Sequence, residues 1–260
     1  SRMGFAIIGA FIGAIVGGLP GFLIGGLIGY GAGFLLRQSL LGGLRVVQSQ
    51  LLESVFAVMG ALCKADNVIT RDEINAVEQM FGMLNLHGEQ REQAKAAFNR
   101  GKQPEFDLDA AVDQFARISH GRRPLVQLFL QLQVMAIGAD GRIDPAEHTM
   151  LVRIARRLGL SEADVSQLEA LLRAGTTGPS GPGARPTQDK LADAYIALGV
   201  TPDNDAAAIK RAYRKLISQN HPDKLAARGL PESMRAVAEE RSRELNSAYD
   251  LIKAARNDLR

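Results

Sequence analysis

The residues of this 260-residue chain that are best suited to bind a partner lie near its C-terminal end. Four basic side chains occur there with no acidic residue between them, and we call them the basic quartet: Lys210, Arg211, Arg214 and Lys215. The tripeptide His221-Pro222-Asp223 follows shortly afterwards. Side chains four residues apart share one face of a helix, so the quartet predicts a helix face of one charge. Such a face steers an oppositely charged partner towards it.

The chemistry that these residues indicate is docking rather than catalysis. The sequence has no GxxxxGK[ST] loop for nucleotide phosphates and no HExxH zinc motif. Its other histidines, His87, His120 and His148, are scattered and form no nucleophile–base pattern. We therefore expect no catalytic residue, no cofactor and no metal, and the chain is predicted not to be an enzyme. Taken alone, the basic quartet would indicate a solvated helix face, with nucleic acid as a rival partner.

Composition sets weaker limits on function. The net charge is +3 and the isoelectric point is near 9.1, which does not by itself indicate nucleic-acid binding. The single cysteine, Cys63, excludes an internal disulfide and a zinc-ribbon module.

Three helices are predicted around the basic quartet and the tripeptide. The first ends at Gly199, which suits a C-terminal turn. Asp203 is expected to cap a second helix over about residues 204–219, and Pro231 opens a third helix that ends near Ala255. Apolar residues at helical spacing predict the inner faces, Ile209, Ala212, Tyr213 and Leu216 on the second helix and Leu245, Ala248, Tyr249 and Ile252 on the third. Two long helices joined by a tight loop predict an antiparallel hairpin.

Four motifs occur in order between residues 195 and 249: YxxLGV, KRAYRKL, HPD and LNSAY. Over residues 189–260 the sequence resembles the J domain of DnaJ-like co-chaperones. The resemblance implies that the chain binds a DnaK-type chaperone in its ATP state and accelerates ATP hydrolysis by that chaperone. It also implies that His221, Pro222 and Asp223 form the family's essential loop, in which Asp223 engages an arginine of the chaperone. The basic quartet would then dock on an acidic surface.

Residues 46–173 are predicted to form a second helical domain, because apolar residues recur at helical spacing. They are Leu51, Leu52, Val55, Val58, Met59 and Leu62, then Ile74, Val77, Phe81 and Leu84, then Leu128, Leu132, Met135 and Ala136. An acidic turn occurs twice, as ADNVITRDE at 65–73 and ADGRIDPAE at 139–147. The capping-box pairs Thr70 with Glu73 and Asp144 with Glu147 predict that each turn starts a helix.

The acidic turns also suggest a metal hypothesis, in which Asp140, Asp144 and Glu147 supply oxygen ligands. The residue order of an EF-hand is absent, so we favour helix capping. The repeat resembles TerB-like domains, which are helical bundles with two such turns. That resemblance implies a link to membrane-associated stress systems and, in some members, to metal.

Residues 3–36 carry no charged side chain and predict a membrane segment, since ~20 apolar residues cross a bilayer. Glycine recurs there at every fourth position, at Gly9, Gly13, Gly17, Gly21, Gly25, Gly29 and Gly33. This glycine stripe predicts close helix–helix packing and hence a homodimer. Pro20-Gly21 leaves a hairpin open as an alternative, but its arms would be short and we favour a single span. The flanking arginines lean only slightly towards a cytoplasmic C-terminal part.

The predicted fold class is all-α, with a transmembrane helix at 3–36, a TerB-like domain at 46–173, a flexible linker at 174–188 and a J domain at 189–260. This combination resembles membrane-anchored DnaJ-like co-chaperones of bacteria. It implies a single-pass inner-membrane protein whose soluble part lies in the cytoplasm. The expected partners are a DnaK-type chaperone, membrane lipid and a second copy of the chain, without nucleic acid. In an alternative function, the TerB-like domain senses metal or membrane stress and the J domain is its output.

Overall fold

The computed structural model describes residues 49–65, 70–139, 143–175, 188–227, 232–256 and 259. All regular elements in these residues are helices, which confirms the all-α fold class for this part of the chain. The predicted membrane segment and its glycine stripe lie outside the described residues, as do residues 176–187 of the predicted linker. Among the helices that are described, none has both the length and the apolar character needed to cross a membrane. Residues Leu51–Arg260 form one compact unit.

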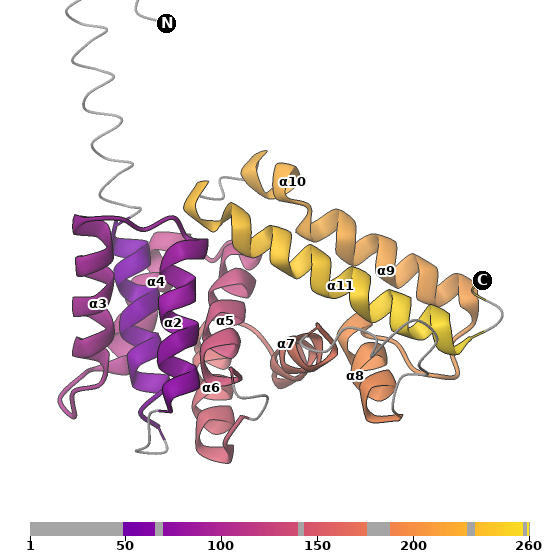
Figure 1. The fold of residues 1–260 in the computed structure, drawn as a ribbon, viewed down its shortest axis with the longest axis horizontal. Coiled ribbons are helices and arrows are strands. Elements are labelled where there is room, and N and C mark those ends of the chain that lie inside the picture. The colour runs from indigo at the N-terminus through magenta and orange to yellow at the C-terminus, as the bar shows by residue number, and fades with distance from the viewer. Residues whose placement is uncertain are drawn as a thin grey trace, which may run out of the picture. The chain divides into compact units, whose positions relative to one another are not determined.

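In the residues that the structure describes, the first part of this unit is a helical bundle (Figure 1). A helix over residues 49–62 comes first. It is followed by α2 (Arg71–Met83), α3 (Glu89–Gly101), α4 (Leu108–Ser119), α5 (Arg123–Ile137), α6 (Pro145–Arg157) and α7 (Glu162–Gly175).

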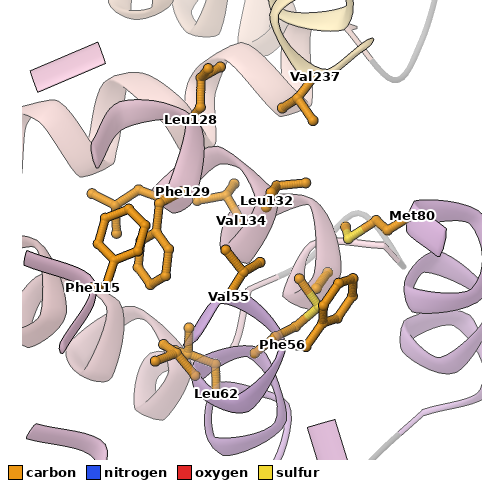
Figure 2. Close-up of a cluster of buried hydrophobic side chains, with 14 of the residues drawn as sticks. Val55, Phe56, Leu62, Met80, Phe115, Leu128, Phe129, Leu132, Val134 and Val237 are labelled. Atoms are coloured by element: carbon orange, nitrogen blue, oxygen red, sulfur yellow. The ribbon is translucent and has the colours of Figure 1, made fainter. Parts of the chain in front are cut away.

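Helix α5 lies in the middle of the bundle core, where every residue from Leu128 to Val134 is buried. A helix that is apolar on all sides is stable only when other elements surround it. Phe129 of α5 stacks on Phe115 of α4 with 4.0 Å between the ring centroids (Figure 2). The predicted core residues are buried or partly buried with one exception, since Ile74 is 48% exposed. Ile74 lies in the first turn of α2, next to the buried Glu73, and its own side chain points to solvent.

The backbones of the first helix and α3 are in direct contact. A Cβ atom added at Gly101 would lie 1.8 Å from the carbonyl oxygen of Ala57, and one added at Gly60 would lie 2.1 Å from that of Phe98. Only glycine allows two helices to approach so closely at these positions.

Both predicted capping boxes are present. The Thr70 hydroxyl accepts a hydrogen bond from the Glu73 amide, and the Glu73 carboxylate accepts one from the Thr70 amide. Asp144 and Glu147 form the same reciprocal pair at the start of α6. These bonds satisfy amide groups that have no partner inside a helix. Asp140 lies outside the described residues.

The C-terminal part of the unit contains the predicted helical hairpin. Its elements are α8 (Gln188–Leu198), α9 (Ala206–Asn220), α10 (Pro222–Ala227), the 3-10 helix η1 (Glu232–Met234) and α11 (Arg235–Ala255). Helices α9 and α11 lie side by side, as predicted (Figure 1). Tyr213 of α9 stacks on Tyr249 of α11 with ring centroids 4.1 Å apart, and its hydroxyl donates to Asn246 Oδ1 at 2.8 Å.

Three details of the hairpin differ from the sequence prediction. The cap of α9 is Asp205 and not Asp203, because Asp205 Oδ1 accepts the Ala208 amide while Asn204 closes a separate turn with Thr201. The tripeptide is not wholly a loop, since Pro222 begins α10. The third helix begins with η1, so α11 starts several residues after the predicted Pro231.

Candidate chaperone-docking site

The basic quartet occupies the solvent-facing side of α9. All four side chains are exposed, whereas Ile209 on the opposite side is fully buried. Within the described part of the chain, no ion pair joins any of the four to an acidic side chain. The first turn of α9 also contains no acidic residue. The predicted face of one charge is therefore present, and its positive charge is available to another molecule.

The tripeptide forms the corner where α9 ends and α10 begins. His221 is the C-cap of α9 and has an extended backbone, with φ −61° and ψ 127°. The Asp223 amide donates to His221 Nδ1 at 3.2 Å. Because Nδ1 accepts this bond, the geometry assigns the proton of a neutral ring to Nε2, which leaves Nε2 as an outward donor.

The three residues of the tripeptide differ in how far they are buried. Pro222 is buried, and Leu225 one turn further along α10 is 1% exposed. These two apolar residues hold the corner to the hairpin. The side chains of His221 and Asp223 remain 51% and 70% exposed, so both can meet a partner.

Arg235, at the start of α11, contacts the tripeptide and was not identified from the sequence. Its Nη2 atom lies 3.0 Å from Asp223 Oδ1, and its Nε donates to Glu239 Oε1 at 3.1 Å. The hydrogen bonds to Glu239 and Asp223 raise the pKa of Arg235. The only sequence signal was the spacing of Arg235 and Glu239 on one helix, which does not indicate the contact with Asp223.

The last residues of the two acidic turns, Glu73 and Glu147, lie near the single cysteine, Cys63. Glu73, Glu147 and Cys63 are all buried. Burial raises the pKa of the Cys63 thiol well above its usual range, and the charges of Glu73 and Glu147 add to this effect. The glutamates cap their own helices, and no group of three or more His, Cys, Asp or Glu side chains in the described ranges is arranged to hold a metal ion.

The hairpin with its exposed histidine and aspartate and its basic face defines a J-domain protein. The family model described as DnaJ domain matches residues 193–257. The model described as Tellurite resistance protein TerB matches residues 52–170. Both predicted resemblances are thereby confirmed.

Curated relatives match both parts together. Co-chaperone protein DjlA of Vibrio parahaemolyticus is 42% identical over 221 residues, which cover 79% of this chain and 78% of that protein. Co-chaperone protein DjlA of Escherichia coli is 38% identical over 215 residues, 79% of either chain. That of Shewanella oneidensis is 34% identical over 230 residues, 87% of this chain and 84% of the relative. The chain belongs to the DjlA family of co-chaperones. No solved structure matches it.

Proposed function

We propose that this co-chaperone binds the ATP state of a DnaK-type chaperone through the basic quartet and the tripeptide, and thereby stimulates ATP hydrolysis by the chaperone. The observation that carries the proposal is that the unpaired basic face of α9 is followed, at the end of the same helix, by an exposed imidazole and carboxylate. The quartet would supply attraction to an acidic surface, which raises the rate of encounter. Asp223 would supply an acceptor for an arginine of the chaperone, the strongest kind of charged hydrogen bond.

The proposal extends to the anchor, on the basis of the sequence. A transmembrane helix at 3–36 would hold the TerB-like domain (46–173), the linker and the J domain (189–260) at the cytoplasmic face of the inner membrane. The glycine stripe would join two copies of the chain within the lipid. We place the J domain on the cytoplasmic side because its proposed partner is an ATPase, which needs ATP. Nucleic acid is not a partner in this proposal, and the chain itself carries out no catalysis.

Charge reversal of Lys210 and Arg214 tests the docking surface. The two side chains are one turn apart on α9, so Lys210→Glu with Arg214→Glu inverts much of the face. We expect the affinity of the full chain for the ATP-bound chaperone to fall by roughly tenfold at low salt and to become less sensitive to salt. Binding measured across a salt titration reports both quantities.

A control with the same change in net charge is available on the bundle. Arg71 and Arg122 are exposed at the starts of α2 and α5, where acidic residues are tolerated. Arg71→Glu with Arg122→Glu should leave binding almost unchanged. Equal losses in the two double variants would show that only the net charge matters and would remove the basis for a specific docking face.

A further inference from the structure

Helix α7 is buried on two sides. One side packs in the TerB-like bundle, and the other packs against helices of the J domain. Val165 and Leu168 belong to the buried core of the TerB-like bundle. Ala170, Leu171 and Ala174 belong instead to a second buried cluster, which they share with the J-domain helices α8 and α11. A helix with two apolar faces is stable only when both are covered. The J-domain helices thus cover an apolar surface that the bundle would otherwise expose.

The bundle core also reaches the residues that support the tripeptide. Leu225 of α10 and Met234, Val237 and Ala238 around the start of α11 are buried in the same cluster as the bundle. Figure 2 shows Val237 in this core together with Leu128 of α5. The corner that carries His221 and Asp223 is therefore packed on the bundle through apolar side chains.

Three polar side chains are buried where α5 meets α11, and we call them the docking latch: Gln131, Arg241 and Glu244. They are 3%, 4% and 7% exposed. Gln131 Nε2 donates to Glu244 Oε2 at 2.8 Å, and Gln131 Oε1 lies 3.5 Å from Arg241 Nη1. The side-chain amide of Gln131, in the TerB-like domain, thus contacts both Arg241 and Glu244 of the J domain. Burial raises the pKa of Glu244 to about 7 and lowers that of Arg241 to about 10.

Two further bonds join α7 to α8. Gln167 Nε2 donates to the carbonyl oxygen of Ala197 at 2.8 Å, and Arg173 Nε lies 3.0 Å from Asp193 Oδ1. Gly175, at the end of α7, packs directly on Glu244. Another orientation of the J domain would leave the buried Gln131 and Glu244 side chains without their mutual hydrogen bond, so these contacts favour the orientation seen.

We infer that the J domain is seated on the TerB-like domain through the second face of α7 and the docking latch, and that this seated form is the one that engages the chaperone. Gln131, Arg241 and Glu244 are then positioning residues that act through the hairpin. The seated arrangement leaves the basic quartet and the side chains of His221 and Asp223 exposed, so it does not block docking. The second half of the inference rests on the proposed function.

An engineered disulfide tests the seated arrangement in the full chain in detergent. A Cβ atom at Gly175 would lie 3.5 Å from Glu244 Cβ, within the range that disulfides span. Gly175→Cys with Glu244→Cys should therefore form an internal disulfide under mild oxidation. Gly175→Cys with Arg243→Cys is the matched control, because Arg243 neighbours Glu244 on α11 but is exposed. Cys63 is fully buried and stays in place in both variants.

Stimulation of a DnaK-type ATPase, measured on the same samples, tests the second half. The reduced Gly175→Cys, Glu244→Cys variant lacks Glu244, so a smaller fraction of J domains is seated and stimulation at limiting concentration should fall. Oxidation should restore it to within about twofold of the wild type, because the disulfide replaces the docking latch.

Each outcome decides one part of the inference. Oxidation of the Arg243 control to the same extent as the Glu244 variant would overturn the seated arrangement. A disulfide-locked protein that stimulates less than its reduced form would show that the J domain must leave the bundle to act, and would overturn the second half. Failure of the wild type itself to stimulate would count against the proposed function, while the disulfide yield would still decide the seating.

Discussion

At the scale of single residues, the three members of the tripeptide have different environments and different roles. Pro222 is buried and fixes the corner, while the His221 ring is oriented by the Asp223 amide. The Asp223 carboxylate is exposed, and Arg235 already contacts it. An arginine of the chaperone would have to displace Arg235 from this carboxylate. The pair is solvent-exposed, so its contribution to stability is small.

Replacement of Arg235 tests this competition. Arg235→Met removes the cation and keeps a long apolar stem, so Asp223 becomes free to engage the chaperone. We expect the apparent affinity for the ATP-bound chaperone to rise by up to about fivefold, the factor that corresponds to an exposed ion pair. Glu239→Gln, which leaves Arg235 with Asp223 as its remaining charged contact, should change affinity in the opposite direction or not at all. A clear loss of affinity in Arg235→Met would instead show that Arg235 holds Asp223 in its working position.

Local sequence patterns were enough to place the exposed residues of the site but not their contacts. The separation of charged and apolar positions on α9 follows from helical periodicity, so the exposure of the basic quartet could be predicted. The contact between Asp223 and Arg235 joins residues 12 apart across a turn, which no periodicity describes.

At the scale of elements, helix starts were predictable because their causes are local. The capping boxes at Thr70 and Asp144 lie within four residues of sequence, and both occur as expected. The cap of α9 was misplaced by two positions because Asp203 and Asp205 are equally good caps by type. The turn that Asn204 makes with Thr201 leaves Asp205 as the cap. The residue types alone do not indicate that this turn forms.

The close approach of the first helix and α3 gives a prediction about stability. Gly101→Ala would place a methyl group against the Ala57 carbonyl, where the obstruction is backbone and cannot rotate away. We expect the free energy of unfolding to fall by roughly 1–3 kcal/mol, or more if the helices cannot separate. Chemical denaturation of the full chain in detergent measures this change.

Gly82 provides the matched control for Gly101. It lies in α2, is exposed, and has no atom within 4 Å of an added Cβ. Gly82→Ala should be neutral or slightly stabilising, because alanine favours the helix over glycine. A protein that tolerates Gly101→Ala as well as Gly82→Ala would contradict the proposed backbone contact.

At the scale of the whole molecule, composition suggested two domains on a flexible linker at 174–188. Residues 176–187 of that linker lie outside the described residues, while α7 ends at Gly175 and α8 begins at Gln188. The sequence did not predict that side chains of the two domains are buried together. The bond between Gln131 and Glu244 joins residues 113 positions apart. Each looks like an ordinary polar residue of its own helix in the sequence, so this part of the fold could not be predicted without tertiary packing.

The proposed homodimer gives a prediction for the membrane segment. Replacing Gly17, Gly21 and Gly25 with leucine keeps residues 3–36 apolar and long enough to insert. It should abolish dimer crosslinking in membranes, because lipid supplies no hydrophobic drive and the contact depends on close backbone packing. The matched control places leucine at Gly18, Gly26 and Gly31, which lie outside the four-residue repeat. Normal membrane fractionation with undiminished crosslinking of the stripe variant would show that the stripe is not the interface.

We propose that the tripeptide makes this chain an activator of a DnaK-type ATPase, and single-turnover ATP hydrolysis measures this activity. His221→Gln keeps a polar side chain at an exposed position, so the fold should persist. His87→Gln makes the same substitution at an exposed histidine of the bundle and serves as the control. We expect the full chain and His87→Gln to accelerate ATP hydrolysis by the chaperone, whereas folded His221→Gln should not. Full acceleration by His221→Gln would contradict the proposal.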